Sequence, residues 1–536
     1  VKQGDPLSSL LFIMCVEILA IRLKEDNLLR HYNMDGVLVK QVLYADDCNI
    51  FLAYHSDSLR RLIKILEDFK RLSGLKIALN KTQVVYLGGT YTQNLRLCPD
   101  IDLAWEQKFR LLGIDFNGSG EEKGYINYNS KIDEIYTEMT GWRNRSLSCE
   151  GRRNVVNSLF LSKLTHITSV VPNLKRPEIN KLESKLYEFI WGTKSSKMPR
   201  KEAKLPPEQG GFRGPDLFSA WIGQKIAWIR KLLLERNNKW TEILEAKLQR
   251  ISPHLHTWNL NDWSMVDINL VIRSMDLSIW KEIFISLKTY ILQDLKQSKE
   301  KALKFRVWGM SILKNENGNT IRLAQVRALH DQKILPLDIV KINNNGIIHV
   351  KSTNEIMTMY PTLPANQVEH ARKALEIFFR DTSVSKAYRP SLIPPMKSYI
   401  VENICKYESG ASWWTKTLKY NASATQSVRQ REIKWETTIP RLNMTEYFWS
   451  KQYKMIEKIR FDNRTKLRQL QLCKGNTKTN IIVKHIVDGL TENCSFCDNV
   501  PEKIDHLFHH CPKVTELRLR VNTHFKNTWL QNREIS

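Results

Sequence analysis

A strand–turn–strand pattern near residue 46 constrains the fold of this chain more than any other feature. The run from Gly36 to Tyr44 is rich in β-branched and aromatic residues, and a second β-like run extends from Cys48 to Tyr54. Two such runs around a short polar break predict a β-hairpin. Asp46 and Asp47 would lie at its tip, with side chains open to solvent.

Two neighbouring carboxylates on a tight turn suit nucleotidyl transfer by two metal ions. This chemistry needs clustered carboxylates that hold two cations about 4 Å apart, one at the primer hydroxyl and one at the triphosphate. Taken alone, an Asp-Asp pair on a turn is more often a solvated turn. The segments on either side of the pair must therefore distinguish a catalytic site from an ordinary turn.

Helical and strand-like patterns surround the hairpin. An apolar-periodic stretch over 6–21 opens with a proline, which is well tolerated at a helix start. A second helix is expected over about 57–73, ended by a glycine. The segments 75–79 and 84–87 are expected to be strands, and 343–346 a turn.

Four segments resemble those of reverse transcriptases, in the family's order and spacing. The first, residues 3–12, is similar to Gln-Gly-X-Pro-Leu-Ser-Pro, with Ser9 replacing the second proline. The third, residues 69–82, resembles Ser-Gly-Leu-X-Ile-Asn-X-X-Lys-Thr, with Ala78 replacing the first asparagine. The fourth is similar to the Tyr/Phe-Leu-Gly-Ile turn. The four segments are 3–12, 44–47, 69–82 and 109–116.

The resemblance implies roles for individual residues. It makes Asp46 the direct Mg²⁺ ligand, supported by Asp47, in a two-metal site. Lys81 would neutralise or protonate the departing pyrophosphate, although a surface lysine beside a strand explains it equally well. The expected contacts to substrate and primer are Gln3, Gly4, Pro6, Tyr44, Leu112 and Gly113.

Further segments resemble the helical thumb of non-LTR (LINE-type) retrotransposon enzymes. They include Trp142-Arg143, Gly151-Arg152, 189–192 and 210–216. The resemblance implies an α+β fold, with a partial right-hand palm, a mainly helical thumb and a small zinc-binding C-terminal segment. The expected domains are a partial palm at 1–116, the thumb at 117–236, a connecting region at 237–459 and the C-terminal segment at 460–536.

Three cysteines and one histidine near the C-terminus have the spacing of a structural zinc site. Cys494, Cys497, His506 and Cys511 would supply three thiolates and an imidazole to one tetrahedral Zn²⁺. His509 and His510 are rival ligands, and His506 is preferred because LINE-type enzymes carry a similar pattern. The apolar residues Phe496, Leu507 and Phe508 are expected to cluster around the metal.

Charge favours nucleic acid as the partner. The chain of 536 residues has a formal net charge of +26, and residues 141–236 hold nineteen Lys and Arg against eight Asp and Glu. The expected partners are an RNA template, a DNA primer or target, and deoxynucleoside triphosphates. An odd number of cysteines, nine, of which six are scattered, does not form a secreted disulfide framework and favours a reducing compartment. The expected location is therefore intracellular, in the nucleus and in a cytoplasmic ribonucleoprotein. The most apolar run is too short for a membrane span.

The chain starts at Val1 and is expected to be a fragment. In the family, a further metal-binding aspartate precedes the glutamine-glycine segment, so this chain alone is expected to be inactive while its parent is a polymerase. Two other hypotheses stand beside this one. The chain is a non-catalytic nucleic-acid-binding remnant of such an element, or an unrelated zinc-binding interaction protein, which the ordered palm segments disfavour.

Overall fold

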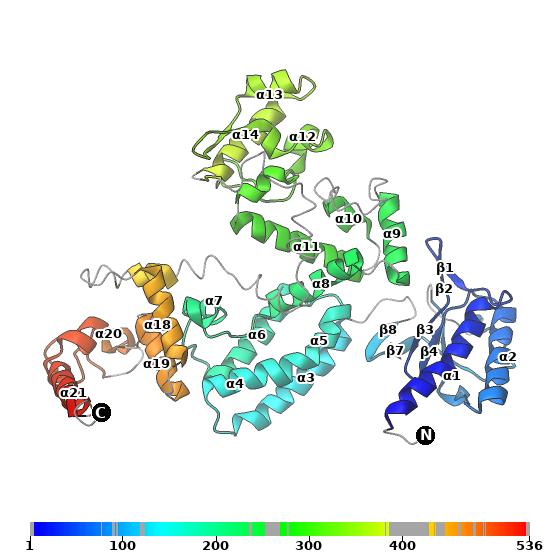
Figure 1. The fold of residues 1–536 in the computed structure, drawn as a ribbon, viewed down its shortest axis with the longest axis horizontal. Coiled ribbons are helices and arrows are strands. Elements are labelled where there is room, and N and C mark those ends of the chain that lie inside the picture. The colour runs from blue at the N-terminus through cyan, green and yellow to red at the C-terminus, as the bar shows by residue number, and fades with distance from the viewer. Residues whose placement is uncertain are drawn as a thin grey trace. The chain divides into compact units, whose positions relative to one another are not determined.

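The computed structural model shows many helices and short, paired strands (Figure 1). All sheets among the described residues are two-stranded. This mixture agrees with the expected α+β class. The structure describes residues 5–76, 78–87, 92, 95–117, 124–234, 238–251, 268–275, 278–297, 299–380, 382–384, 428–433, 435, 445–458, 462–474, 477, 479–485, 487 and 489–531.

Contacts divide the chain into two compact units that interleave along the sequence. Unit 1 comprises 1–135, 162–179 and 217–418, and unit 2 comprises 136–161, 180–216 and 419–536. The four domain boundaries expected from the sequence remain predictions. Among the described residues, three helices pass from one unit to the other, namely α3 (Gly124–Arg143), α5 (Leu161–Val170) and α6 (Arg176–Trp191).

Two helices form the N-terminal core of unit 1, as the sequence predicts. Helix α1 (Pro6–Glu25) begins after Asp5, whose carboxylate accepts the Leu7 N–H at 2.8 Å. Helix α2 (Ser56–Ser73) ends at Gly74, which adopts the left-handed conformation at φ +72°. The buried side chains of this core are Leu19 and Leu23 of α1, Leu62, Ile65 and Leu66 of α2, and Leu29 of the segment after α1.

Helix α1 is apolar on two sides. One side packs on α2, whereas Leu10, Met14 and Ile18 on the other are at least 60% exposed. A helix that is apolar all round is usually buried all round. The outer side of α1 is therefore an apolar surface within the described part of the chain.

The strands next to α1 and α2 differ in part from the expected pattern. The run 36–44 is two strands, because β2 pairs back with β1 while β3 pairs with β4. The expected strand at 75–79 is wrong: Leu75 N–H donates to the Ser73 hydroxyl, and a 3-10 turn follows (Leu79–Lys81). The strands are β1 (Tyr32–Met34), β2 (Val37–Val39), β3 (Gln41–Tyr44), β4 (Asp47–Ile50), β5 (Gln83–Val85), β6 (Ala104–Glu106), β7 (Lys108–Leu111) and β8 (Ile114–Asn117).

The remainder of unit 1 has a large continuous core that the sequence did not predict. It joins helices from α8 to α14 with a hairpin of β9 (Val340–Ile342) and β10 (Ile348–Val350). The turn predicted at 343–346 is confirmed, since Gly346 has φ +80° and the Asn343 side chain accepts the Asn345 and Ile347 N–H groups. The helices are α8 (Leu217–Leu234), α9 (Lys239–Ile251), α10 (Ile268–Ser274), α11 (Ser278–Gln297), α12 (Arg327–Asp331), α13 (Thr353–Met359) and α14 (Ala365–Phe379).

Unit 2 is helical and is held together by a buried ion cluster. The Glu202 carboxylate, 1% exposed, lies 3.2 Å from the Lys474 ammonium and 2.9 Å from the Arg431 guanidinium. These groups join segments more than 200 residues apart in sequence. The elements are α4 (Cys149–Val155), the π turn η3 (Val156–Phe160), α7 (Arg200–Ala203), η4 (Pro207–Gln209), α18 (Glu446–Lys458), α19 (Asn463–Cys473), α20 (Asn480–Val483), the π turn η11 (His506–His510) and α21 (Pro512–Gln531).

The glycine-rich loop after η4 folds back onto the backbone before it. A Cβ atom on Gly211 would lie 1.8 Å from the Leu205 carbonyl oxygen, so only glycine fits there. The Leu205 carbonyl also accepts the Arg213 N–H at 3.0 Å. No helix among the described residues combines the length and apolar character that a bilayer span requires.

A buried carboxylate joins the two N-terminal helices. Asp26, at the end of α1, is almost fully buried and accepts two hydrogen bonds from Arg61 of α2, at 2.6 and 3.0 Å. Its other oxygen accepts the Leu28 N–H. The hydrogen bond from Arg61 holds the pKa of Asp26 below its ordinary value, although burial opposes this.

Replacing Asp26 should loosen α1 and α2 together. We expect Asp26→Asn to lower their opening free energy by about 2 kcal/mol, because a charged hydrogen-bond acceptor in a buried site is lost. Hydrogen exchange of the α1 and α2 amides measures this. Since the folded-state pKa is depressed, the stabilisation is present above the unfolded pKa of about 3.9 and is lost as pH falls through the folded value.

A neighbouring pair on α2 provides a matched control. Arg60 and Asp100 form an exposed bidentate ion pair, and such pairs contribute little to stability. Asp100→Asn should therefore leave the exchange of α1 and α2 nearly unchanged. Equal effects of the two variants would contradict a special role for Asp26.

Candidate active site and metal centre

The Asp46–Asp47 pair lies at the tip of the β3–β4 hairpin, as predicted. Tyr44 pairs with Asp47, which leaves a two-residue turn of Ala45 and Asp46. Ala45 takes a left-handed φ of +51° to make the turn. The side chains of Asp46 and Asp47 are exposed, and Tyr44 is 64% exposed. Both carboxylates are thus open to a cation or a ligand in solution.

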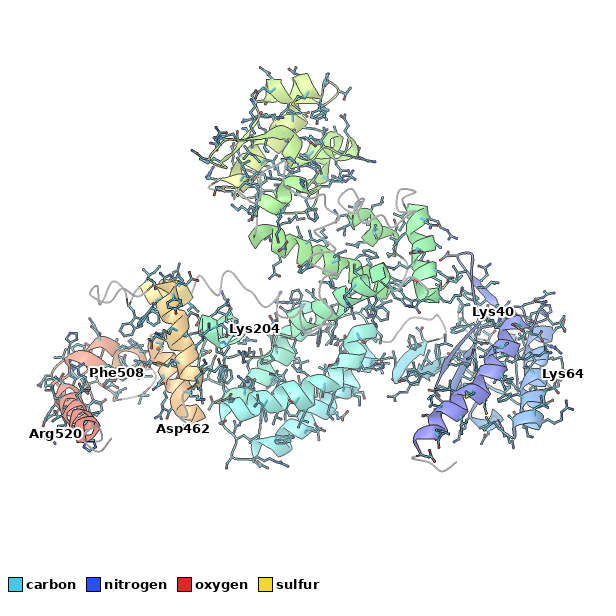
Figure 2. The ribbon with its side chains drawn as sticks, in the orientation of Figure 1. Lys40, Lys64, Lys204, Asp462, Phe508 and Arg520 are labelled. Carbon is cyan, nitrogen blue, oxygen red and sulfur yellow. The ribbon has the colours of Figure 1, made fainter. Side chains whose placement is uncertain are left out.

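The base of this hairpin is fixed to helix α1. The Gln41 side-chain amide donates to the Ala20 carbonyl at 2.7 Å, and Ile50 packs against the α1–α2 core. Lys40, labelled in Figure 2, donates through its ammonium to the Lys24 carbonyl of α1. A rigid base under an exposed tip is the arrangement that a site for charged ligands needs.

The other predicted polymerase residues are placed individually. Pro6 is the first residue of α1, and Gln3 and Gly4 lie outside the described residues. Lys81 is exposed at the end of the 3-10 turn that precedes β5. Its role at a pyrophosphate remains a prediction.

The predicted primer-contact turn is a strained hairpin turn. Leu112 and Gly113 connect β7 and β8 with φ values of +47° and +84°, the signs of a type I′ turn. Leucine is unfavourable in this conformation, by roughly 1–2 kcal/mol. The ring of His166, from α5, makes a 2.7 Å hydrogen bond with the Leu112 carbonyl.

A second helix also anchors this hairpin. The Asn127 side chain, from α3, accepts the Asp115 N–H at 2.9 Å and donates to the Asp115 carbonyl at 3.0 Å. Phe109 and Phe116 stack on the hairpin face at 5.2 Å. Sequence reasoning missed Asn127 and His166, because neither belongs to a recognisable pattern and only the tertiary fold brings them to the turn.

The four predicted zinc ligands gather in unit 2. Their ligand atoms all lie within 4.8 Å of one another, with 3.9 Å between the Cys494 and Cys511 sulfurs and 3.3 Å between Cys497 Sγ and His506 Nε2. Tetrahedral zinc with Zn–S of about 2.3 Å and Zn–N of about 2.05 Å requires separations of about 3.8 and 3.6 Å. Geometry and donor chemistry therefore fit Zn²⁺.

The backbone of this metal centre is organised by a buried glutamate. Glu502, 5% exposed, accepts the N–H groups of Asn480 and Ser495 and the Ser495 hydroxyl, each at 2.9 Å. Asp498 makes the tight turn after the second cysteine at φ +53°. Glu502 thus ties the Cys-X-X-Cys segment to the start of α20, a role with no signal in the sequence.

The surroundings of the ligands differ from one expectation. Phe496 is 60% exposed and Phe508, labelled in Figure 2, is 36% exposed, so these rings do not form a cluster buried around the metal. The rival ligand His510 directs Nδ1 toward the Asp505 carbonyl at 3.3 Å. The side chain of His509 is outside the described part of the chain.

Comparison with known proteins supports the assignment of the N-terminal region. Residues 1–116 match the family model of reverse transcriptase (RNA-dependent DNA polymerase). A protein of Arabidopsis thaliana named "Putative ribonuclease H protein" is 24% identical over 202 residues, which are 35% of this chain. The match spans 30% of the length of that relative.

Metal content tests the metal centre directly. We expect one zinc per chain, lost in Cys497→Ser and kept in the control Cys473→Ser, whose cysteine lies in α19 outside the cluster. Loss of zinc should also melt the segment around it, because structural zinc contributes on the order of 10 kcal/mol. Elemental analysis and hydrogen exchange of residues 479–524 measure both effects.

The histidine ligand is tested separately. His506→Ala should weaken zinc binding strongly, whereas His510→Ala should not. The reverse result would show that the site exists with a different imidazole, and equal exchange with and without chelator would show that no metal organises this segment.

Proposed function

We propose that this chain is part of an RNA-directed DNA polymerase of a non-LTR (LINE-type) retrotransposon. The observation that carries the proposal is the exposed Asp46–Asp47 pair on an anchored hairpin, within the 116 residues that match the reverse transcriptase family. The thumb-like segments 189–192 and 210–216 support the LINE type by resemblance.

The proposed site assigns a task to each residue. Asp46 and Asp47 hold Mg²⁺, which supplies activation of the primer hydroxyl and charge neutralisation at the triphosphate. The exposed ring of Tyr44 lies beside the two acids and contacts the incoming nucleotide. Leu112 and Gly113 contact the primer end, where the hairpin held by Asn127 and His166 fixes the backbone.

The proposed nucleic-acid surface depends on charge. The exposed part of the basic excess in 141–236, nineteen Lys and Arg against eight Asp and Glu, attracts the phosphates of an RNA template and a DNA primer. The zinc-binding segment is a structural support at the end of the chain. The proposed partners are therefore RNA, DNA and deoxynucleoside triphosphates.

A non-catalytic nucleic-acid-binding protein is the second candidate. The basic excess and the metal centre are as consistent with this candidate as with the polymerase, because neither feature involves Asp46 or Asp47. The two candidates differ in what the Asp46–Asp47 pair contributes. Only the polymerase requires this pair to bind metal and act on a nucleotide.

Removing one carboxylate tests the polymerase. In the longest form of the protein that extends a primer, Asp46→Ala should lower incorporation of deoxynucleotides by at least 1,000-fold, as is typical for an essential group. Binding of the primer–template should change little. The matched control is Asp57→Ala, an exposed acid in the first turn of α2. Unreduced incorporation by Asp46→Ala would exclude the proposed site.

Salt dependence tests the charged surface. The chain should bind RNA and DNA with little sequence preference, and log affinity should fall steeply with log salt as counterions are released. Filter binding between 50 and 200 mM KCl measures the slope. An affinity that is flat over this range would contradict a phosphate-binding surface.

A pair of variants localises this surface. Replacing three exposed lysines of the basic segment by alanine should reduce the slope by about two, and replacing three exposed lysines elsewhere should not. The basic-segment set is Lys181, Lys194 and Lys201, and the control set is Lys314, Lys333 and Lys373.

A further inference from the structure

Three tryptophans from three helices of unit 1 meet at one place. Trp240 and Trp280 stack with their ring centres 5.6 Å apart and an interplanar angle of 17°. Trp228 meets both edge-on, at 5.2 and 6.4 Å. Trp228 belongs to α8, Trp240 to α9 and Trp280 to α11, and these helices are neighbours in Figure 1. We call these three residues the tryptophan cluster.

The tryptophan cluster is half-buried, and core packing and one hydrogen bond fix its position. Its rings pack against the large core of unit 1 while part of each remains accessible. The Trp228 indole N–H donates to the Ser169 carbonyl at 2.8 Å, which fixes one ring. A fixed, accessible aromatic group loses little conformational entropy when a planar ligand stacks on it.

Each of the three helices carries an exposed lysine close in sequence to its tryptophan. The Lys231 ammonium lies 4.9 Å above the ring of Trp228, and Lys239 and Lys281 directly adjoin Trp240 and Trp280 in sequence. Of these, Lys239 also pairs with Glu242 at 2.6 Å.

The charge of the surrounding residues adds to these lysines. Arg176, exposed at the first position of α6, places its guanidinium 3.7 Å from the ring centre of Phe218, which lies on the same helix as Trp228. Glu282 follows Lys281, but its carboxylate accepts a hydrogen bond from Asn173, and burial raises its pKa. The exposed cations closest in sequence to the three tryptophans are thus Lys231, Lys239 and Lys281, of which Lys239 is shared with Glu242.

We propose that the tryptophan cluster is a binding site for unpaired nucleic-acid bases. Bases of a single strand stack on the accessible indole faces, and Lys231, Lys239 and Lys281 contact the phosphates between them. This pairing of aromatic faces with cations is the chemistry by which proteins bind single strands without sequence preference. Duplex nucleic acid, whose bases already stack on one another, should bind here poorly.

The inference deepens the proposed function, on which it rests for the class of ligand. A polymerase that copies a template must handle unpaired strand before it enters the site. None of the residues assigned to the Mg²⁺ ions, the nucleotide or the primer end belongs to α8, α9 or α11, although Lys231 also lies in the basic segment 141–236. The tryptophan cluster is thus a separate site for the strand, and its loss can be measured without catalysis.

Binding of three oligonucleotide probes tests the site. The probes are fluorescein-labelled dT12, a twelve-unit abasic strand with the same phosphates, and a duplex of equal length. The unaltered chain should bind dT12 about ten-fold more tightly than the abasic strand, since stacking adds to the phosphate contacts. Trp280→Ala should remove most of this preference, and Trp280→Phe should restore much of it.

The matched control uses an aromatic residue with similar surroundings. Phe378 of α14 is half-buried, packs on the same core and has the Lys299 ammonium 5.7 Å from its ring centre. Phe378→Ala should keep the ten-fold preference for bases. If it loses the preference as Trp280→Ala does, general loosening of the core explains the effect and the proposal is overturned.

A lysine variant keeps the test decisive if Trp280→Ala unfolds. The triple replacement of Lys231, Lys239 and Lys281 by alanine leaves the indoles in place, and should weaken dT12 and abasic binding equally while reducing the salt slope. An unchanged slope overturns the proposal, as does a preference for bases that survives Trp280→Ala. Absence of any nucleic-acid binding would instead overturn the proposed function.

Discussion

The packing of α1 against α2 supports the β3–β4 hairpin, which presents Asp46 and Asp47 to solvent. The β3–β4 hairpin has only four residues in each strand, and an isolated two-stranded hairpin is marginal in water. Here Gln41 and Lys40 bond to carbonyls of α1, and Ile50 extends the α1–α2 core. The Asp46–Asp47 tip therefore owes its order to two helices whose own junction is closed by Asp26 and Arg61.

Local patterns predicted the elements that depend on local chemistry. The helix that follows Asp5, the glycine end of α2, the hairpin around Ala45 and the turn at Gly346 all follow from capping, periodicity or turn residues. The gathering of Cys494, Cys497, His506 and Cys511 was also predictable, from their short spacing for the cysteines and from the family resemblance for the choice of histidine. These features need little information from distant parts of the chain.

The features that the sequence did not predict are set by distant contacts. The split of the 36–44 run depends on β1 as a pairing partner, and the support of the Leu112 turn depends on helices beyond it. The core of residues 217–384 draws its side chains from many short elements, none of which has a distinctive pattern. Glu202 and Lys474 meet across 272 residues, a separation at which sequence patterns carry no signal.

The close approach of Gly211 to the Leu205 carbonyl limits which changes of codon 211 the protein tolerates. Every change at the first two positions of a glycine codon introduces a side chain or a stop, and only third-position changes are silent. A side chain at position 211 would clash with the backbone of Leu205, and no change of a neighbouring side-chain rotamer can relieve that clash. Every missense change of codon 211 is thus expected to displace the loop after η4 from the backbone at Leu205.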